Sequence, residues 1–220
     1  MRLAELGFII LAATYSASSY AQNPDDALKV YAVNVVRDHP QSKEPFVSSG
    51  IYLGQGMVIT VAHVIGPNLR VRIAGRDLRV NIIKQGSSDT TDLALLSLDE
   101  LNLPVSLLLR RIPLCKEPPK AGDNVVVVVP SGTRRSRIIS RGGINAFIGD
   151  VSTIGDSGSG IFDAQKRCLL GIMNEKISDF YYLMKNGSVV RDLARGSIDT
   201  AKHFVPASEI ADFIPPELRF

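Results

Sequence analysis

The sequence predicts an all-β protein with two halves of about six strands each, followed by one short helix. From residue 27 onward, apolar and polar residues alternate mainly with a period of two, which is typical of β-strands. The 18 Gly and 12 Pro supply the turns that short strands need. An apolar content of 45% provides a hydrophobic core and excludes a disordered chain.

Six apolar runs in the first half each predict one strand. They are residues 27–36, 47–53, 57–64, 69–74, 78–83 and 93–98. Six short strands are enough to close a small barrel, which we place at about 27–98. The proline-rich segment 99–120 then predicts a connection across the surface.

The second half repeats this pattern and predicts a second barrel over about 121–205. Its predicted strands are residues 124–129, 137–140, 158–162, 169–173, 180–184 and 201–205. Only the tail predicts a helix, because 206–213 is amphipathic and is followed by Pro215 and Pro216. We therefore assign 206–220 to a C-terminal helix and tail.

Residues 1–21 predict a signal peptide. A positively charged start precedes the apolar run 6–13, and Ser19 and Ala21 satisfy the small-x-small cleavage rule, so we expect cleavage before Gln22. The alternative is an uncleaved anchor, but about eight apolar residues fall short of the ~20 that span a bilayer. We expect an exported protein, periplasmic or secreted, without stable membrane insertion.

Export determines how the two cysteines are interpreted. Cys115 and Cys168 would lie in an oxidising compartment, where one disulfide is expected; two free buried thiols are the alternative. Closing the loop between them would stabilise the fold by roughly 4 kcal/mol in the chain-entropy model.

Charge and ligand patterns exclude several function classes. A net charge of +3 is no nucleic-acid footprint, so we expect no nucleic-acid partner. The sequence has no His-x-x-x-His or Cys-x-x-Cys pair, so we expect neither a metal nor a cofactor. The basic run 134–137 predicts a solvated loop, or alternatively a loop that rims a cleft and attracts acidic substrates.

Three short motifs carry the residue types of nucleophilic catalysis. An apolar strand ends in Thr-x-Ala-His, which places His63 where the strand gives way to a turn. Asp92 opens the apolar strand 93–98, and the glycine-flanked turn 155–160 contains Ser157. Each motif alone has an ordinary explanation as a packed histidine, a loop aspartate or a plain turn.

Together the motifs supply a nucleophile, a base and an orienting carboxylate. A serine hydroxyl needs an imidazole to take its proton, and the imidazole needs a carboxylate on its other nitrogen. We therefore expect Ser157 to be the nucleophile, His63 the general base and acid, and Asp92 the orienter. The backbone N–H groups of Gly155 and Ser157 are expected to face the developing oxyanion.

These residues resemble the signatures of the trypsin-like (chymotrypsin-fold) serine protease family. The family's Thr-Ala-Ala-His, Asp-Ile-Ala-Leu-Leu and Gly-Asp-Ser-Gly-Gly occur in the same order here. They read Thr-Val-Ala-His at 60–63, Asp-Leu-Ala-Leu-Leu at 92–96 and Gly-Asp-Ser-Gly-Ser at 155–159. The tail Phe-Val-Pro at 204–206 is also similar to the end of this domain in Deg-type bacterial members.

The resemblance implies a protease domain over 22–214, with two antiparallel barrels around a cleft that holds the triad. It implies a protein or peptide substrate and hydrolysis through an acyl-enzyme, as in a bacterial secreted or periplasmic type without a PDZ domain. By resemblance, the specificity pocket is lined near 151–154, 173–176 and 202–204. Since no Asp stands at its base, we do not expect a preference for Arg or Lys.

Two other classes of protein compete with this interpretation. An α/β-hydrolase would use the order Ser157, Asp199, His203, but that fold needs G-x-S-x-G and alternating helices, which the sequence lacks. A catalytically inactive, protease-like binding protein is the second. The retained His63, Asp92 and Ser157 argue against it, because an inactive relative need not keep any of them.

Overall fold

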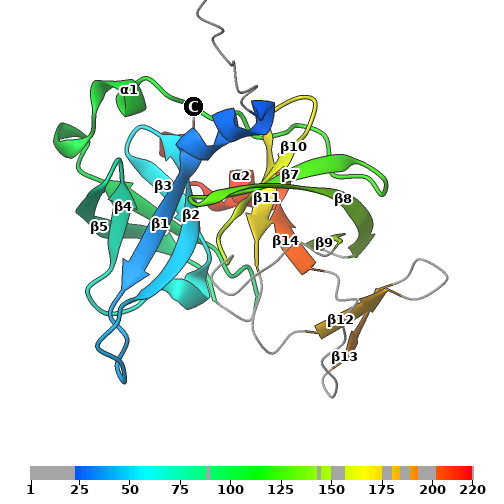
Figure 1. The fold of residues 1–220 in the computed structure, drawn as a ribbon, viewed down its shortest axis with the longest axis horizontal. Helices are drawn as coiled ribbons and strands as arrows, with labels where there is room; N and C mark the ends of the chain where they lie inside the picture. The colour runs from blue at the N-terminus through cyan, green and yellow to red at the C-terminus, as the bar shows by residue number, and fades with distance from the viewer. Residues whose placement is uncertain are drawn as a thin grey trace, which may run out of the picture.

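The computed structural model describes residues 23–87, 90–142, 145–149, 157–174, 180–183, 189–192 and 202–219. Two closed six-stranded antiparallel barrels lie side by side, with a short helix near the C-terminus (Figure 1). The predicted fold class is confirmed. The predicted signal peptide, 1–21, lies outside the described residues. Within the described ranges, none of the helices has the length and apolar character of a membrane span.

The first barrel closes in the order β1-β2-β3-β6-β5-β4. Its strands are β1 (Ala32–Arg37), β2 (Phe46–Gly54), β3 (Met57–Thr60), β4 (Arg70–Ile73), β5 (Arg76–Gln85) and β6 (Ala94–Leu98). All six coincide with or overlap runs that alternation predicted. β2 is buried without interruption from Ser48 to Gly54, because one of its faces lies in the barrel core and the other meets the second barrel.

The second barrel closes in the order β10-β11-β14-β9-β8-β7. Its strands are β7 (Asn124–Val129), β8 (Gly132–Gly142), β9 (Asn145–Ile148), β10 (Gly160–Asp163), β11 (Leu169–Met173) and β14 (Lys202–Pro206).

One strand of the second half was assigned wrongly from the sequence. The run 180–184 contains β12 (Phe180–Leu183), but this strand pairs with β13 (Val189–Asp192) in a separate two-stranded sheet that projects from the barrel (Figure 1). The missing barrel strand is β9, which pairs with β8 and β14. Its sequence, Asn145–Ile148, has one polar residue followed by three apolar ones, so it shows no alternation of its own.

A continuous hydrophobic core joins the two barrels. Ile51 and Leu53 of β2 belong to the same buried cluster as Val126, Phe162 and Leu169 of the second barrel. Gly160 lies at the contact, because a Cβ at this position would crowd Ile51 and Phe162. The barrels therefore pack against each other through interdigitated side chains.

The predicted C-terminal helix is present as α2 (Ala207–Phe213), which packs on β11 and β14. The connection between the barrels is not entirely irregular, since it contains the short helices η3 (Glu100–Asn102) and α1 (Val105–Leu108). A last turn, η4 (Pro216–Leu218), follows α2. The Cys115–Cys168 disulfide is present and attaches the connection to the second barrel, with the two Cα atoms 5.1 Å apart.

The start of the described chain also differs from expectation. Residues 27–36 predicted one strand, but a 3-10 helix, η1 (Pro24–Tyr31), precedes β1. The Asn23 side chain accepts a hydrogen bond from the Asp25 N–H, and Pro24 stands in the first turn, as at many helix starts. Because η1 lies across the ends of both barrels (Figure 1), it links them on one side.

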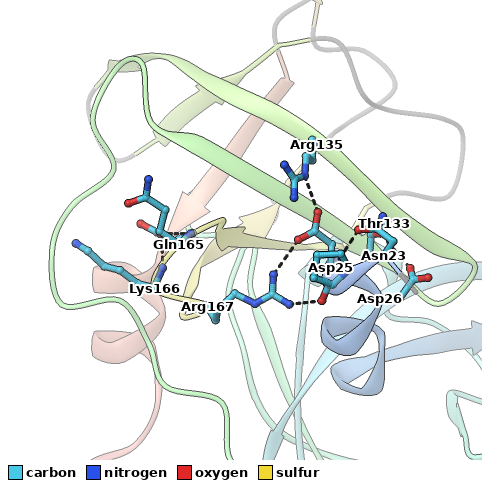
Figure 2. Close-up of polar contacts among 10 residues, drawn as sticks. Asn23, Asp25, Asp26, Thr133, Arg135, Gln165, Lys166 and Arg167 are labelled. Carbon is cyan, nitrogen blue, oxygen red and sulfur yellow. Dashed lines mark hydrogen bonds and ion pairs between the residues drawn. The ribbon is translucent and has the colours of Figure 1, made fainter. Parts of the chain in front are cut away.

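A buried carboxylate attaches η1 to the second barrel, as Figure 2 shows. Asp25 is 1% exposed and accepts from Arg135 Nε at 2.7 Å and Arg167 Nη1 at 2.8 Å. Arg167 also donates to the Pro24 carbonyl oxygen at 2.6 Å. The run 134–137 is therefore part of β8 and not a loop, and Arg135 serves this attachment. We call Asp25, Arg135 and Arg167 the N-terminal clamp.

Hydrogen bonding in the N-terminal clamp changes the acidity of Asp25. The hydrogen bond from Arg135 holds the pKa of Asp25 below its usual 3.8; burial opposes this effect, and Arg167 adds to it. The ionised carboxylate is thus the form that the fold stabilises. Its contribution to the free energy of unfolding is complete above the usual pKa and is lost as the pH falls through the lowered one.

We predict that Asp25→Asn lowers the free energy of unfolding by about 1–3 kcal/mol near pH 7, because two charge-assisted hydrogen bonds are lost from a buried site. Denaturant unfolding measures the loss. Asp26→Asn is the matched control, since Asp26 is exposed and accepts a side-chain hydrogen bond from Thr133. The difference between parent and Asp25→Asn should shrink as the pH falls below 3.8, the usual pKa of this carboxyl; a difference that stays the same as the pH falls would contradict the clamp.

Candidate active site

His63 lies where the sequence placed it, at the end of an apolar strand. β3 ends at Thr60, and the single turn η2 (Ala62–Val64) follows directly. The His63 side chain is 23% exposed, so the imidazole is partly accessible to solvent. Its main chain is held as well, because the His63 N–H donates to Asp92 Oδ1 at 2.9 Å.

Asp92 is fully buried and lies two residues before the start of β6. Its second carboxylate oxygen, Oδ2, lies 2.7 Å from His63 Nδ1, so one carboxylate binds both the backbone and the ring of the same histidine. The Asp92 carbonyl also accepts from the Ala62 N–H at 3.2 Å. Asp92 has a φ of +43°, a left-handed conformation that aspartate tolerates better than most residues. The turn therefore aims a buried charge at the imidazole.

Ser157 comes from the second barrel, in the turn that leads into β10. Its Oγ lies 3.1 Å from His63 Nε2. Two backbone hydrogen bonds position this turn: the Ser49 N–H of β2 donates to the Ser157 carbonyl at 3.0 Å, and the Gly158 N–H donates to the Met173 carbonyl at 2.8 Å. The hydroxyl is thus held between strands of both barrels.

The structure adds Ser49, Thr60 and Gly158 as supports of this turn. The Thr60 hydroxyl donates to the Ser49 carbonyl at 2.7 Å in a buried position. Gly158 has a φ of +85°, and a Cβ there would overlap the Ser49 carbonyl oxygen and the Thr60 hydroxyl. Two adjacent buried serines, Ser48 and Ser49, interrupt the otherwise apolar interior of β2, and this is the sequence signal that could have identified the support.

Other predicted site residues are not part of this arrangement. Gly155, the second expected oxyanion donor, lies outside the described residues, and so does 151–154 of the expected specificity pocket. His203 lies in β14 with its ring against Phe147, so the histidine beside Ser157 is His63. Among the residues that the structure describes, no group of three or more His, Cys, Asp or Glu could hold a metal ion.

The fold and this geometry define a class of protein. A serine hydroxyl, an imidazole and a buried carboxylate form one hydrogen-bonded series at the junction of two six-stranded antiparallel barrels. This is the arrangement of nucleophile, base and orienter that serine peptidases of the chymotrypsin fold use.

Comparison with known families agrees with that class. The model of the trypsin-like peptidase domain family matches residues 48–172, and the chain belongs to this family of serine-type endopeptidases. A search of curated proteins finds no significant match.

Solved structures share the fold at low sequence identity. The active form of the Rv3671c protease from M. tuberculosis is 18% identical, with a TM-score of 0.59 over 87% of this chain and 85% of that one. The inactive form of the same protease is 18% identical, with a TM-score of 0.57 over 86% and 89% of the two chains. A serine endoprotease from Yersinia pestis is 22% identical, with a TM-score of 0.59 over 86% and 62%.

We predict that Gly158→Ala displaces Ser157 and lowers the free energy of unfolding by about 2–5 kcal/mol, because it combines backbone strain with steric overlap. Gly75→Ala is the matched control: Gly75 has a φ of +76°, but a Cβ there would meet no atom within 4 Å, so only the strain of about 1–2 kcal/mol remains. Denaturant unfolding of both variants separates the two effects. Equal losses would show that the close approach to Ser49 and Thr60 is unimportant.

Proposed function

We propose that this protein is an exported serine endopeptidase that hydrolyses protein or peptide substrates through an acyl-enzyme intermediate. Ser157 is the nucleophile, His63 the general base and acid, and Asp92 the orienter. One observation carries the proposal: Ser157 Oγ lies 3.1 Å from His63 Nε2, while His63 Nδ1 lies 2.7 Å from Asp92 Oδ2. Both distances allow proton transfer and orientation without rearrangement.

In the acylation step, Ser157 Oγ attacks the scissile carbonyl carbon and its proton passes to His63 Nε2. Collapse of the tetrahedral intermediate breaks the C–N bond, and His63 Nε2 gives the proton to the leaving amine. Water then repeats the sequence: it loses a proton to His63, attacks the acyl carbon and restores the Ser157 hydroxyl. We assign stabilisation of the oxyanion to the N–H groups of Ser157 and Gly155.

Asp92 acts through the tautomer of His63. A carboxylate at Nδ1 keeps the proton there, so that Nε2 is free to accept from the serine, and it stabilises the imidazolium that forms. The second bond, from the His63 N–H to Asp92 Oδ1, supports this role because it prevents the histidine from moving away from its partner. Asp99, a nearby acidic residue in the sequence, does not take the role of orienter, because its carboxylate caps η3 beyond the far end of β6. Asp89 lies outside the described residues.

The proposed export agrees with the disulfide. Bonds such as Cys115–Cys168 form and persist in oxidising compartments and are rare in reducing ones. Together with the signal-peptide pattern at 1–21, this supports a periplasmic or secreted location.

A fluorophosphonate probe tests the nucleophile. The probe should label the oxidised protein, and Ser157→Ala should abolish both labelling and peptide hydrolysis, because the attacking oxygen is gone. Ser106→Ala, at an exposed serine of α1, is the matched control and should label like the parent. Hydrolysis fully retained in Ser157→Ala would rule out the serine mechanism.

Substitution of Asp92 tests the orienter. Asp92→Asn should reduce turnover by about 10⁴, the loss seen when the triad aspartate of a serine protease becomes asparagine and the imidazole takes the wrong tautomer. Asp99→Asn should be near neutral, because asparagine also caps a helix. Steady-state kinetics measures both, and thermal unfolding confirms that each variant is folded. Parental activity in Asp92→Asn would mean that another group orients His63.

A further inference from the structure

A cavity lies apart from the proposed triad, between the connection that joins the barrels and the C-terminal segment. Its volume is about 580 Å³, within the range of small-molecule sites. The walls come from the end of β2, residues 111–116 of the connection, α2, and the segment 214–219 that contains η4. None of the residues that line it belongs to the proposed triad or to the supports of Ser157.

The cavity has an apolar interior and a basic rim. Its apolar walls include Leu53, Ile112, Leu114, Ile214 and Leu218. The charged residues that line it are Arg111, Lys116 and Arg219, all of them exposed, and no acidic or neutral hydrogen-bonding side chain lines it. An apolar cavity whose charged lining residues are all cationic attracts a ligand that has an apolar body and an anionic end.

Backbone carbonyls hold two of the rim side chains in place. Arg219 Nε donates to the Ile214 carbonyl at 3.0 Å, and Arg111 Nη1 donates to the Leu108 and Arg110 carbonyls at 2.8 Å. At Arg219, the neutral carbonyl orients the guanidinium group without cancelling its charge. Lys116 makes no ion pair with the described residues, since the adjacent Glu117 pairs with Lys166 instead. Lys116 and Arg219 therefore carry the positive charge on which the inference rests.

We propose that this cavity is a binding site for a straight-chain aliphatic carboxylate, with the chain among the apolar walls and the carboxylate at the basic rim. An alkyl chain needs no hydrogen-bond partners inside the cavity. A peptide would bring amide groups, which are costly to bury where the side chains offer them no partners. A cationic amphiphile would meet like charges at the rim. The composition of the site therefore favours a fatty-acid anion over either alternative.

Isothermal titration calorimetry of the oxidised full chain with dodecanoate, below its micelle-forming concentration, tests the proposal. We expect one binding site, and affinity that rises about fourfold per methylene from octanoate to dodecanoate, as burial of each CH₂ predicts. Lys116→Glu should weaken dodecanoate binding about tenfold, because it reverses one charge at the rim. Lys43→Glu makes the same change in net charge at an exposed site elsewhere and should have no effect.

A second variant tests the cavity itself. Ala211→Phe, on the α2 wall, should abolish dodecanoate binding by filling the space, while fluorophosphonate labelling of Ser157 stays unchanged. Three results would overturn the proposal: equal affinity for dodecyltrimethylammonium, equal weakening by Lys116→Glu and Lys43→Glu, or tighter binding of acetyl-Leu-Leu-Phe than of dodecanoate. The last would assign the cavity to a peptide carboxylate. None of the binding measurements requires turnover, so the outcome is independent of the proposed catalysis.

Discussion

The hydrogen bond from the Ser49 N–H to the Ser157 carbonyl is the contact on which the rest of the site depends. His63 and Asp92 belong to the first barrel, whereas Ser157 belongs to the second, so the three side chains meet only while the two barrels keep their relative position. A backbone hydrogen bond is directional, which packing alone is not. The Thr60 hydroxyl donates to the Ser49 carbonyl, and Gly158 leaves the room that the close approach of these groups requires.

Burial of the Asp92 carboxylate is a cost that the local backbone offsets. An ionised group in an apolar interior is unfavourable unless hydrogen bonds replace its lost water. Asp92 receives one from the main chain of His63 and one from its ring, and both depend on the turn that its left-handed φ creates. The same two bonds that make the buried charge tolerable therefore determine where the imidazole points.

Sequence patterns predicted what is local and missed what joins distant segments. Short apolar runs located all six strands of the first barrel, and the three motifs identified His63, Asp92 and Ser157, which the structure brings together. The strand β9 was missed because Asn145–Ile148 does not alternate, while the apolar, aromatic-rich run at 180–184 imitated a barrel strand. At η1, the apolar residues at 27, 28, 30 and 31 imitated a strand. The partners of Asp25 and of the Ser157 carbonyl lie far away in sequence, so no local pattern could reveal them.

The N-terminal clamp has a consequence for the order in which the molecule is completed. Asp25 binds Arg135, which lies 110 residues further along the chain, and Arg167, which lies 142 residues further along. Both arginines belong to the second barrel, so η1 cannot be seated while only the first barrel has been synthesised. Closing loops of this length costs chain entropy before the contacts that compensate for it exist. A segment that leaves the ribosome before either barrel is thus among the last to dock.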